Sequence, residues 1–388
     1  MKKTIGIDAR MYGLKHAGIG RYTTSLLDEL TKLENFSRFN WVLFARQEDL
    51  AKLKEKYKDK FHYIKANFSH YSLAEQILFP FVLYKINCSL IHFPHFNVPI
   101  LYRKPFVITI HDLIKNYSRG PETTTRNQFI YFIKYLGYQL VIKNAIRKTQ
   151  KIFTPSQFIK KQIIDQYQTN PEKIVATPEG IDNKFSISKF QFSKKEKEET
   201  LKKYQIKKPY LLYVGSVYPH KNIDRLIEAV KIAREKVPQI ELVIVCSRSI
   251  FWERLRKKIN LAKARGFIKL TGFIPDQNLA IVYQEAASFI FPSLSEGFGL
   301  PPLEAMASGC PVISSNATCL PEIYGRAALF FDPLNQKEIA EKIISIIKNK
   351  KLQNQYRARG LKKAGEYSWE KMAKKTFDEY QHLHPRGV

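Results

Sequence analysis

The chain has 388 residues, 44% of them hydrophobic and 13% aromatic, which excludes an intrinsically disordered protein and predicts two domains instead of one core. Its 64 Lys and Arg against 35 Asp and Glu leave a formal net charge of +29, which favours nucleic acid, an anionic membrane surface or a phosphate-bearing substrate as partner. No apolar run approaches the ~20 residues of a membrane-spanning helix, and no apolar segment typical of a secretory signal precedes the first predicted strand.

Short apolar strands alternate with amphipathic helices along the chain, which predicts an α/β fold with parallel sheets built from βαβ units. The first half is predicted to contain strands at residues 4–8, 41–44, 63–65, 90–93, 106–110, 151–154 and 174–177. The second half is predicted to contain strands at residues 210–214, 241–246, 268–271, 287–291, 312–315 and 328–331. Each set suits one doubly wound domain, over residues 1–182 and 209–367. The lysine-rich segment 183–208 is predicted to be an exposed connector, and a last helix is expected over about 368–388.

Two groups of polar or flexible residues follow strands in the first half. The loop after the first strand contains Gly18, Gly20 and Arg21. It lacks the full dinucleotide fingerprint, so either a ligand-facing loop or a plain tight turn is expected. His111 and Asp112 directly follow the strand at 106–110. Strand ends in doubly wound domains form sites, which favours a site role for this pair over a purely structural histidine.

The segment from Arg126 to Lys151 has six basic and no acidic residues, interleaved with aromatic side chains. Two interpretations stay open. Apolar positions on more than one face favour a helix buried in the domain, with its lysines in water. The basic and aromatic composition also suits a helix that rests on anionic lipid headgroups.

A second strand-to-helix turn lies at the start of the second domain. The strand at 210–214 ends at Gly215, and a helix is predicted to start near Asn222. His220 and Lys221 lie between them. A lysine at this turn can reach a diphosphate at the carboxyl edge of the sheet, where ligands bind in open α/β folds. The alternative is a solvated lysine on a turn.

Residues 292–312, PSLSEGFGLPPLEAMASGCPV, place Glu296 and Glu304 eight positions apart around Gly297 and Gly299. An apolar strand precedes the glycines and a helix follows them. Strand, glycine loop and helix N-terminus form a phosphate-binding geometry. The two carboxylates suit hydroxyl groups instead, so the predicted ligand carries both phosphate and polyol, as a nucleotide-sugar does. The alternative is a surface loop with two solvated carboxylates.

These segments together resemble the retaining GT-B glycosyltransferases of family four. Residues 292–312 are similar to the E-x7-E motif of that family, residues 209–227 to its G-x5-K-N turn, and residues 107–114 to its strand-end histidine. The glycine loop at 13–22 is similar to the family's loop after the first strand. The resemblance implies two Rossmann-like domains that face each other across a cleft. The N-terminal domain would bind the acceptor, the C-terminal domain would bind the donor, and the last helix would pack back on the N-terminal domain.

The resemblance also implies roles for individual residues. Glu296 would contact the donor sugar near its reacting carbon, Glu304 would bind the nucleotide ribose, and Lys221 would contact the donor phosphates. His111 would approach the donor sugar from the acceptor domain. The remaining implied donor contacts are Gly215, Ser216, His220, Gly297, Phe298, Gly299 and Leu300, and the implied acceptor or diphosphate loop residues are Gly18, Arg21 and Asp112. Ser216 and His220 depart from the family pattern, which often has Arg at these positions.

The implied reaction is transfer of a sugar to an acceptor hydroxyl with retention, without a metal or cofactor. The subgroup that the motifs most resemble contains many mannosyltransferases, which makes GDP-mannose a candidate donor and a lipid-linked surface glycan a candidate acceptor. Four cysteines without a C-x-x-C pair favour a reduced, cytoplasmic protein, here at the inner face of a membrane. Alternatives are a GT-B scaffold with an impaired site, a basic membrane-binding or nucleic-acid-binding protein, and a GT-B epimerase or sugar-phosphate synthase. No nucleic-acid motif is present, so nucleic acid is not expected as partner.

Overall fold

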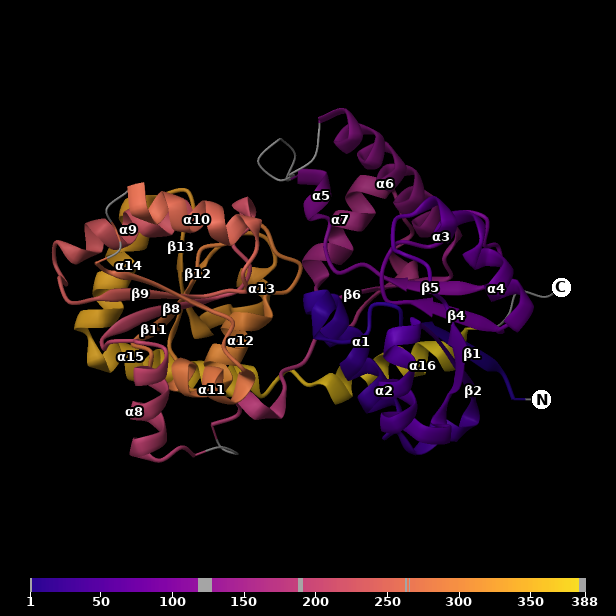
Figure 1. The fold of residues 1–388 in the computed structure, drawn as a ribbon, viewed down its shortest axis with the longest axis horizontal. Helices are drawn as coiled ribbons and strands as arrows, with labels where there is room; N and C mark the ends of the chain where they lie inside the picture. Colours follow the sequence, from indigo (N-terminus) through magenta and orange to yellow (C-terminus); the bar gives the residue numbers. More distant parts are fainter. Residues whose placement is uncertain (1, 118–127, 188–190, 262–263, 265, 384–388) are drawn as a thin grey trace. The chain divides into compact units, whose positions relative to one another are not determined.

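The computed structural model describes residues 2–117, 128–187, 191–261, 264 and 266–383. The chain divides into two compact units (Figure 1). The first unit comprises residues 1–113, 124–180 and 369–388, and the second comprises residues 114–123 and 181–368. Each unit contains one sheet with helices on both of its faces, so the prediction of an α/β fold with two Rossmann-like domains is confirmed.

The first unit is built on a seven-stranded parallel sheet with the order β3-β2-β1-β4-β5-β6-β7. Its strands are β1 (Thr4–Asp8), β2 (Asn40–Ala45), β3 (His62–Lys65), β4 (Leu90–Phe93), β5 (Phe106–Thr109), β6 (Lys151–Thr154) and β7 (Ile174–Ala176). Its helices are α1 (Ala17–Leu30), α2 (Gln47–Tyr57), α3 (Leu73–Ile77), α4 (Phe79–Ile86), α6 (Gln128–Lys148), α7 (Gln157–Tyr167) and α16 (Trp369–His382).

Alternate residues of these strands pack on opposite faces of the sheet. One face carries Phe44, Ile91 and Ile108, which share a core with residues of α4, α6 and α7. The other face contacts α1 and α16, where the fully buried His92 lies 2.5 Å from the hydroxyl of Tyr380. Figure 1 shows α3, α4 and α6 on one side of this sheet and α1, α2 and α16 on the other.

The second unit is built on a six-stranded parallel sheet with the order β10-β9-β8-β11-β12-β13. Its strands are β8 (Tyr210–Val214), β9 (Glu241–Val245), β10 (Ile268–Gly272), β11 (Ser288–Phe291), β12 (Val312–Ser315) and β13 (Ala328–Phe331). Its helices are α5 (Ile114–Tyr117), α8 (Lys194–Lys203), α9 (Ile223–Arg234), α10 (Ile250–Leu261), α11 (Asp276–Glu285), α12 (Leu300–Ala307), α13 (Leu320–Tyr324), α14 (Gln336–Lys348) and α15 (Lys350–Ala364). In the described residues every predicted strand is present, with each end within one residue of its expected position.

The segment expected as a connector contains a helix that belongs to the second unit. Ser193 and Glu196 form a capping box at the start of α8. Lys197 on α8 lies 3.0 Å from Glu285 at the end of α11, and Lys208 also pairs with Glu285. Residues 188–190 of this segment, the end of the last predicted helix at 384–388, and Arg126 lie outside the described residues. Within the described part of the chain, none of the helices has the length and apolar character required to cross a bilayer.

Candidate functional site

Two loops of the second unit meet because they follow adjacent parallel strands. The backbone N–H of Leu294, in the loop after β11, donates to the carbonyl of His220, in the turn after β8, at 2.8 Å. Asn222 holds the same turn in a left-handed conformation, with φ of 61°. Its buried side-chain amide donates to the carbonyls of Pro292 and Pro333, at 3.1 and 2.8 Å. The turn that carries Lys221 is therefore fixed against the loop that carries Glu296.

Lys221 and Glu296 form an ion pair at this junction. The Lys221 Nζ lies 2.5 Å from Glu296 Oε1, and only 15% and 10% of the two side chains are exposed. The ammonium also lies 5.6 Å from the ring centroid of Phe291, the last residue of β11. The Glu296 N–H donates to Thr318 Oγ1 at 3.2 Å. Two predicted residues that are 75 positions apart thus come together, and the alternative of a solvated lysine is wrong.

The negative charge of Glu296 affects two buried neighbours, Tyr213 and Cys319. Burial raises the pKa of Tyr213, and the Glu296 carboxylate raises it further. The same two causes, in the same order, raise the pKa of the Cys319 thiol. Since these groups stay neutral, Lys221 is the positive charge that the structure places beside this carboxylate.

The helix α12 begins directly after this loop. Gly299 is its N-cap residue, with φ of +87°. A Cβ at this position would lie 2.2 Å from the hydroxyl oxygen of Tyr324, which donates to the Gly299 carbonyl at 2.7 Å, so only glycine fits here. Leu300 starts the helix and prolines follow in the first turn. Pro301 and Pro302 have no N–H, so the backbone donors near this end come from the glycine loop and Leu300, and together with the helix dipole they favour an anion.

Two other predicted residues of this segment have buried side chains. Glu304 on α12 is 3% exposed, and its Oε2 accepts a hydrogen bond of 3.2 Å from the Tyr283 hydroxyl. Phe298 is 4% exposed, and its ring packs edge-on against Tyr367 at 5.5 Å. Phe298 therefore anchors the loop in the core of the unit. Glu296 is also buried, with 8% of the residue exposed. The alternative of two solvated carboxylates is therefore wrong.

The remaining predicted donor contacts lie in the turn after β8. Gly215 follows the strand with φ of 148°. The exposed Ser216 is held through its carbonyl, which accepts from the Tyr213 hydroxyl at 2.6 Å. The half-buried His220 ring stacks on Tyr218, with centroids 5.9 Å apart and planes 9° from parallel. Ser216 and His220 therefore sit in the predicted turn, and Lys221 supplies its fixed cationic group.

In the first unit, His111 is held between a carbonyl and a carboxylate. Its Nε2 lies 3.0 Å from the Pro94 carbonyl, and its Nδ1 lies 3.2 Å from Glu179 Oε1. A carbonyl only accepts, so the contact with Pro94 is donated by the Nε2–H of the imidazole. The Tyr22 ring packs edge-on against the imidazole at 4.7 Å. The ring of His111 is thus oriented at the carboxyl edge of this sheet.

Asp112 and the glycine loop lie at the same edge of the first unit. Asp112 is half-buried, and its negative charge adds to burial and to Glu75 in raising the pKa of Tyr71. Gly18 and Arg21 lie in the first turns of α1. A Cβ at Gly20 would lie 1.9 Å from the Gly13 carbonyl, whereas nothing lies within 4 Å of one at Gly18. The tight-turn interpretation therefore explains Gly20 and leaves Gly18 as an exposed glycine at a helix N-terminus.

Two family models match the chain in the order of its two units. Residues 16–185 match the Glycosyltransferase Family 4 model, and residues 195–363 match the Glycosyl transferases group 1 model. The chain is a glycosyltransferase of family four. It is therefore an enzyme that transfers a sugar from a nucleotide-sugar donor to a glycan acceptor.

Curated relatives and solved structures agree with this family. The chain is 29% identical to O-antigen chain mannosyltransferase B of Escherichia coli over 94% of this chain and 96% of that protein. It is 30% identical to O-antigen chain mannosyltransferase RfbU of Salmonella typhimurium over 69% and 66% of the two chains. A glycosyltransferase from Rickettsia africae has the same fold, with a TM-score of 0.73 at 19% identity over 98% of each chain. A sucrose-phosphate synthase from Thermosynechococcus elongatus superimposes with a TM-score of 0.74 at 19% identity, over 98% and 99%.

Sequence reasoning missed three residues that organise these sites in the glycosyltransferase. Asn222 was expected only as a helix start, although its left-handed backbone and two amide hydrogen bonds hold its turn against the loops after β11 and β13. Glu179 follows β7 and orients His111. Arg10 follows β1 and is fully buried between carboxylates. Arg10 and Glu179 lie just beyond strand ends, and that position is the signal that could have found them, whereas Asn222 is the N-cap residue of α9.

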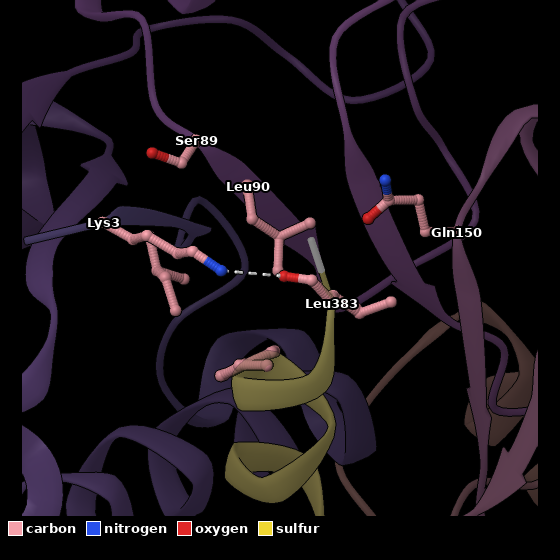
Figure 2. A pocket seen from close by; sticks show the side chains of 7 residues that line it. Lys3, Ser89, Leu90, Gln150 and Leu383 are labelled. Carbon is pink, nitrogen blue, oxygen red and sulfur yellow. Dashed lines mark hydrogen bonds between the residues drawn. The ribbon is translucent and has the colours of Figure 1, made fainter. Parts of the chain in front are cut away.

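A pocket lies at the other edge of the first sheet of this glycosyltransferase (Figure 2). It is lined by Lys3, Ile5, Ser89, Leu90, Gln150, Tyr380 and Leu383. The Lys3 Nζ donates to the Leu383 carbonyl at 3.3 Å, just after the end of α16. A lysine that binds a carbonyl at a helix C-terminus stabilises that end. We therefore interpret the pocket as a packing gap around the end of α16.

Proposed function

We propose that this glycosyltransferase moves mannose from GDP-mannose to a hydroxyl of a lipid-linked glycan at the inner face of a membrane, with retention of configuration. The observation that carries the proposal is the buried Lys221–Glu296 pair beside the N-terminus of α12. The choice of mannose is supported by the Escherichia coli relative, an O-antigen chain mannosyltransferase that the chain matches over nearly its whole length.

The proposed reaction uses charge stabilisation by the second unit. The bond between the sugar C1 and the phosphate oxygen breaks, and a bond between C1 and the acceptor oxygen forms. Negative charge grows on the departing diphosphate, where Lys221 and the backbone amides around Gly297–Leu300 stabilise it. Glu296 binds the sugar hydroxyls, and the acceptor hydroxyl loses its proton to the diphosphate. The scheme uses neither a metal nor a cofactor.

Two further residues have proposed binding roles. Glu304 accepts hydrogen bonds from the ribose hydroxyls, because it is a carboxylate on the first turns of the helix that receives the phosphates. His111 positions a sugar hydroxyl from the first unit, with its ring orientation set by Glu179. We propose Gly18 and Arg21 as contacts for phosphate or acceptor at the start of α1.

Stabilisation by nucleotide-sugars tests the donor assignment. GDP-mannose at 100 times its Kd is expected to stabilise the native protein by about 2.7 kcal/mol, and UDP-, ADP- and TDP-sugars at the same concentration are expected to give much smaller shifts. Glu304→Gln should remove most of the GDP-mannose shift, because an amide cannot accept both ribose hydroxyls. Tyr283→Phe is the matched control, since it removes the neighbour of Glu304 and leaves the carboxylate. Differential scanning fluorimetry at fixed salt gives the answer, and an undiminished shift in Glu304→Gln would contradict the assignment.

A further inference from the structure

The exposed large hydrophobic side chains of the glycosyltransferase are concentrated on the first unit. Among the described residues, the most exposed are Leu73 at 79%, Phe81 at 68% and Leu140 at 65%. We define the apolar patch as Leu73, Ile77, Leu78, Phe81, Ile100, Leu101, Phe132, Ile133, Leu136 and Leu140, all more than a third exposed. In the described part of the second unit the exposed large hydrophobic residues are Tyr218, Ile250, Phe273, Leu334 and Leu361, far apart in the sequence. Exposed apolar side chains that gather on one unit are typical of an interaction site.

The helix α3 has the reverse of the polarity expected in water. Its carboxylate, Glu75, is fully buried, while Leu73 and Ile77 at its two ends are 79% and 51% exposed. Glu75 Oε1 lies 2.8 Å from the Arg10 guanidinium, and its Oε2 accepts from Asn97 Nδ2 at 2.6 Å. The buried network therefore fixes the orientation that turns the apolar side chains of α3 outward.

The helix α6 carries apolar side chains on its exposed side as well as on its buried side. Tyr138 and Ile142 pack in the core of the unit. The opposite stripe, at helical spacing, carries Phe132, Leu136, Leu140, Lys143 and Arg147, all exposed. Apolar side chains at neighbouring positions of an exposed helix stripe are typical of a surface that contacts a partner. The buried side agrees with the interpretation of a helix packed in the domain, and the exposed stripe leaves contact with lipid headgroups open.

Contacts join α3, α4 and α6 into one surface through the loop around Ile100. The Ile100 N–H donates to Gln76 Oε1 on α3 at 3.0 Å. The Tyr84 hydroxyl on α4 donates to the Leu101 carbonyl at 3.0 Å. The Lys148 Nζ on α6 donates to the Ile100 carbonyl at 3.3 Å. Figure 1 shows these three helices on the same side of the sheet.

Positive charge surrounds the apolar patch. Residues 71–105 and 128–151 contain one acidic residue, the buried Glu75. The same segments contain the basic residues Lys85, Arg103, Lys104, Lys134, Lys143, Arg147, Lys148 and Lys151. Lys151 is the member of this set that pairs with a carboxylate, Glu379, at 3.5 Å. Apolar side chains in segments rich in Lys and Arg complement a bilayer whose headgroups carry negative charge. A second copy of the chain is disfavoured as occupant, because like charges would face each other across the contact.

We propose that the apolar patch inserts into the headgroup region of an anionic lipid bilayer, with the surrounding Lys and Arg on the lipid phosphates. The proposal deepens the proposed function, since it gives the enzyme a docking surface where a lipid-linked acceptor lies. The docking proposal rests on the proposed function only for the reason why the enzyme would bind a membrane. Binding to vesicles needs neither donor nor acceptor, so failure of the two proposals can be told apart.

Vesicle binding by matched variants tests the proposal. The wild-type protein is expected to sediment with phosphatidylcholine–phosphatidylglycerol vesicles and to bind pure phosphatidylcholine at least ~5-fold more weakly. Phe81→Ser with Leu140→Ser should weaken binding to the anionic vesicles at least ~10-fold. Phe273→Ser with Leu334→Ser makes the same two changes at positions 63% and 61% exposed on the second unit, and it should bind as the wild type does.

Three results would overturn the proposal. The first is absence of wild-type binding to anionic vesicles, and the second is an equal loss in both double variants. The third is a wild-type dimer in light scattering that Phe81→Ser with Leu140→Ser converts to a monomer, without an effect of lipid, which would assign the patch to self-association. The melting temperature of each variant shows that it folds. A GDP-mannose thermal shift equal to that of the wild type in the patch variant supports a docking role separate from the donor site.

Discussion

Lys221→Met is expected to lower kcat for sugar transfer by about 10²–10³-fold, the effect of removing one preorganised group that stabilises developing charge. The Lys221 side chain is 15% exposed and its ammonium lies 2.5 Å from Glu296, so water does not readily replace it. Its turn is fixed by Asn222, so the charge is in place before reaction. KM for the donor should change less than kcat, because charge grows on the diphosphate mainly in the transition state. Steady-state kinetics with the nucleotide-sugar measures both.

Two further variants distinguish loss of the Lys221 charge from loss of folding as the cause of a lower kcat. Lys221→Arg keeps a cation and should recover part of kcat, whereas Lys221→Met should not. Glu296→Ala is expected to abolish transfer while the protein stays folded, because it removes the proposed ligand of the sugar hydroxyls. A kcat for Lys221→Met within about threefold of the wild type would contradict the assigned role.

Arg10→Met is expected to destabilise the protein by about 3–5 kcal/mol, the cost of removing one partner from a buried ion pair. The Arg10 side chain is fully buried. Its Nε and one terminal nitrogen donate to the two oxygens of Asp8 at 2.8 and 2.7 Å, and the guanidinium lies 4.0 Å from the Phe79 ring centroid. Met fills similar space, but it leaves Asp8 and Glu75 as buried carboxylates without their cation. Urea unfolding at pH 7 measures the loss.

The pH dependence distinguishes lost charge from lost packing in Arg10→Met. In the wild type, burial alone would raise the pKa of Asp8, but the Arg10 guanidinium holds it below its usual range. Without Arg10 the folded pKa of Asp8 is expected to rise above its unfolded value of about 4. Stability then falls as pH rises through that interval, so the loss should be largest at pH 7 and shrink towards pH 4. Adding Asp8→Asn and Glu75→Gln should restore part of the stability, and a loss independent of pH would contradict this explanation.

Much of the architecture follows from local patterns in the sequence. The strands are short apolar runs whose neighbours along the chain are amphipathic helices, so their positions were predictable to within one residue. Glycines, prolines and acidic residues at 292–312 indicated the strand–loop–helix geometry around Gly299. The turn at Lys221 was predictable because β8 is apolar and ends in glycine. Adjacent parallel strands then bring both turns to one edge.

Features that depend on tertiary contacts were not predictable. The burial of Arg10 depends on Asp8 from the same strand end and on Glu75 from a distant helix. Phe298 sits in a ligand-like motif, but its ring packs on Tyr367, which is 69 positions away. The outward-facing Leu73 also runs against the expectation that apolar residues are buried, because the ion network of its neighbour Glu75 sets the orientation of α3.

Product analysis tests the central claim most directly. Purified protein would be incubated with labelled GDP-mannose and a mannoside acceptor that carries a hydrophobic tag, and the product linkage would be read by NMR. The account predicts transfer that gives an α-linked mannoside, the configuration of the donor, and that Glu296→Ala abolishes. Absence of transfer from every nucleotide-sugar tested, or a β-linked product, would contradict it.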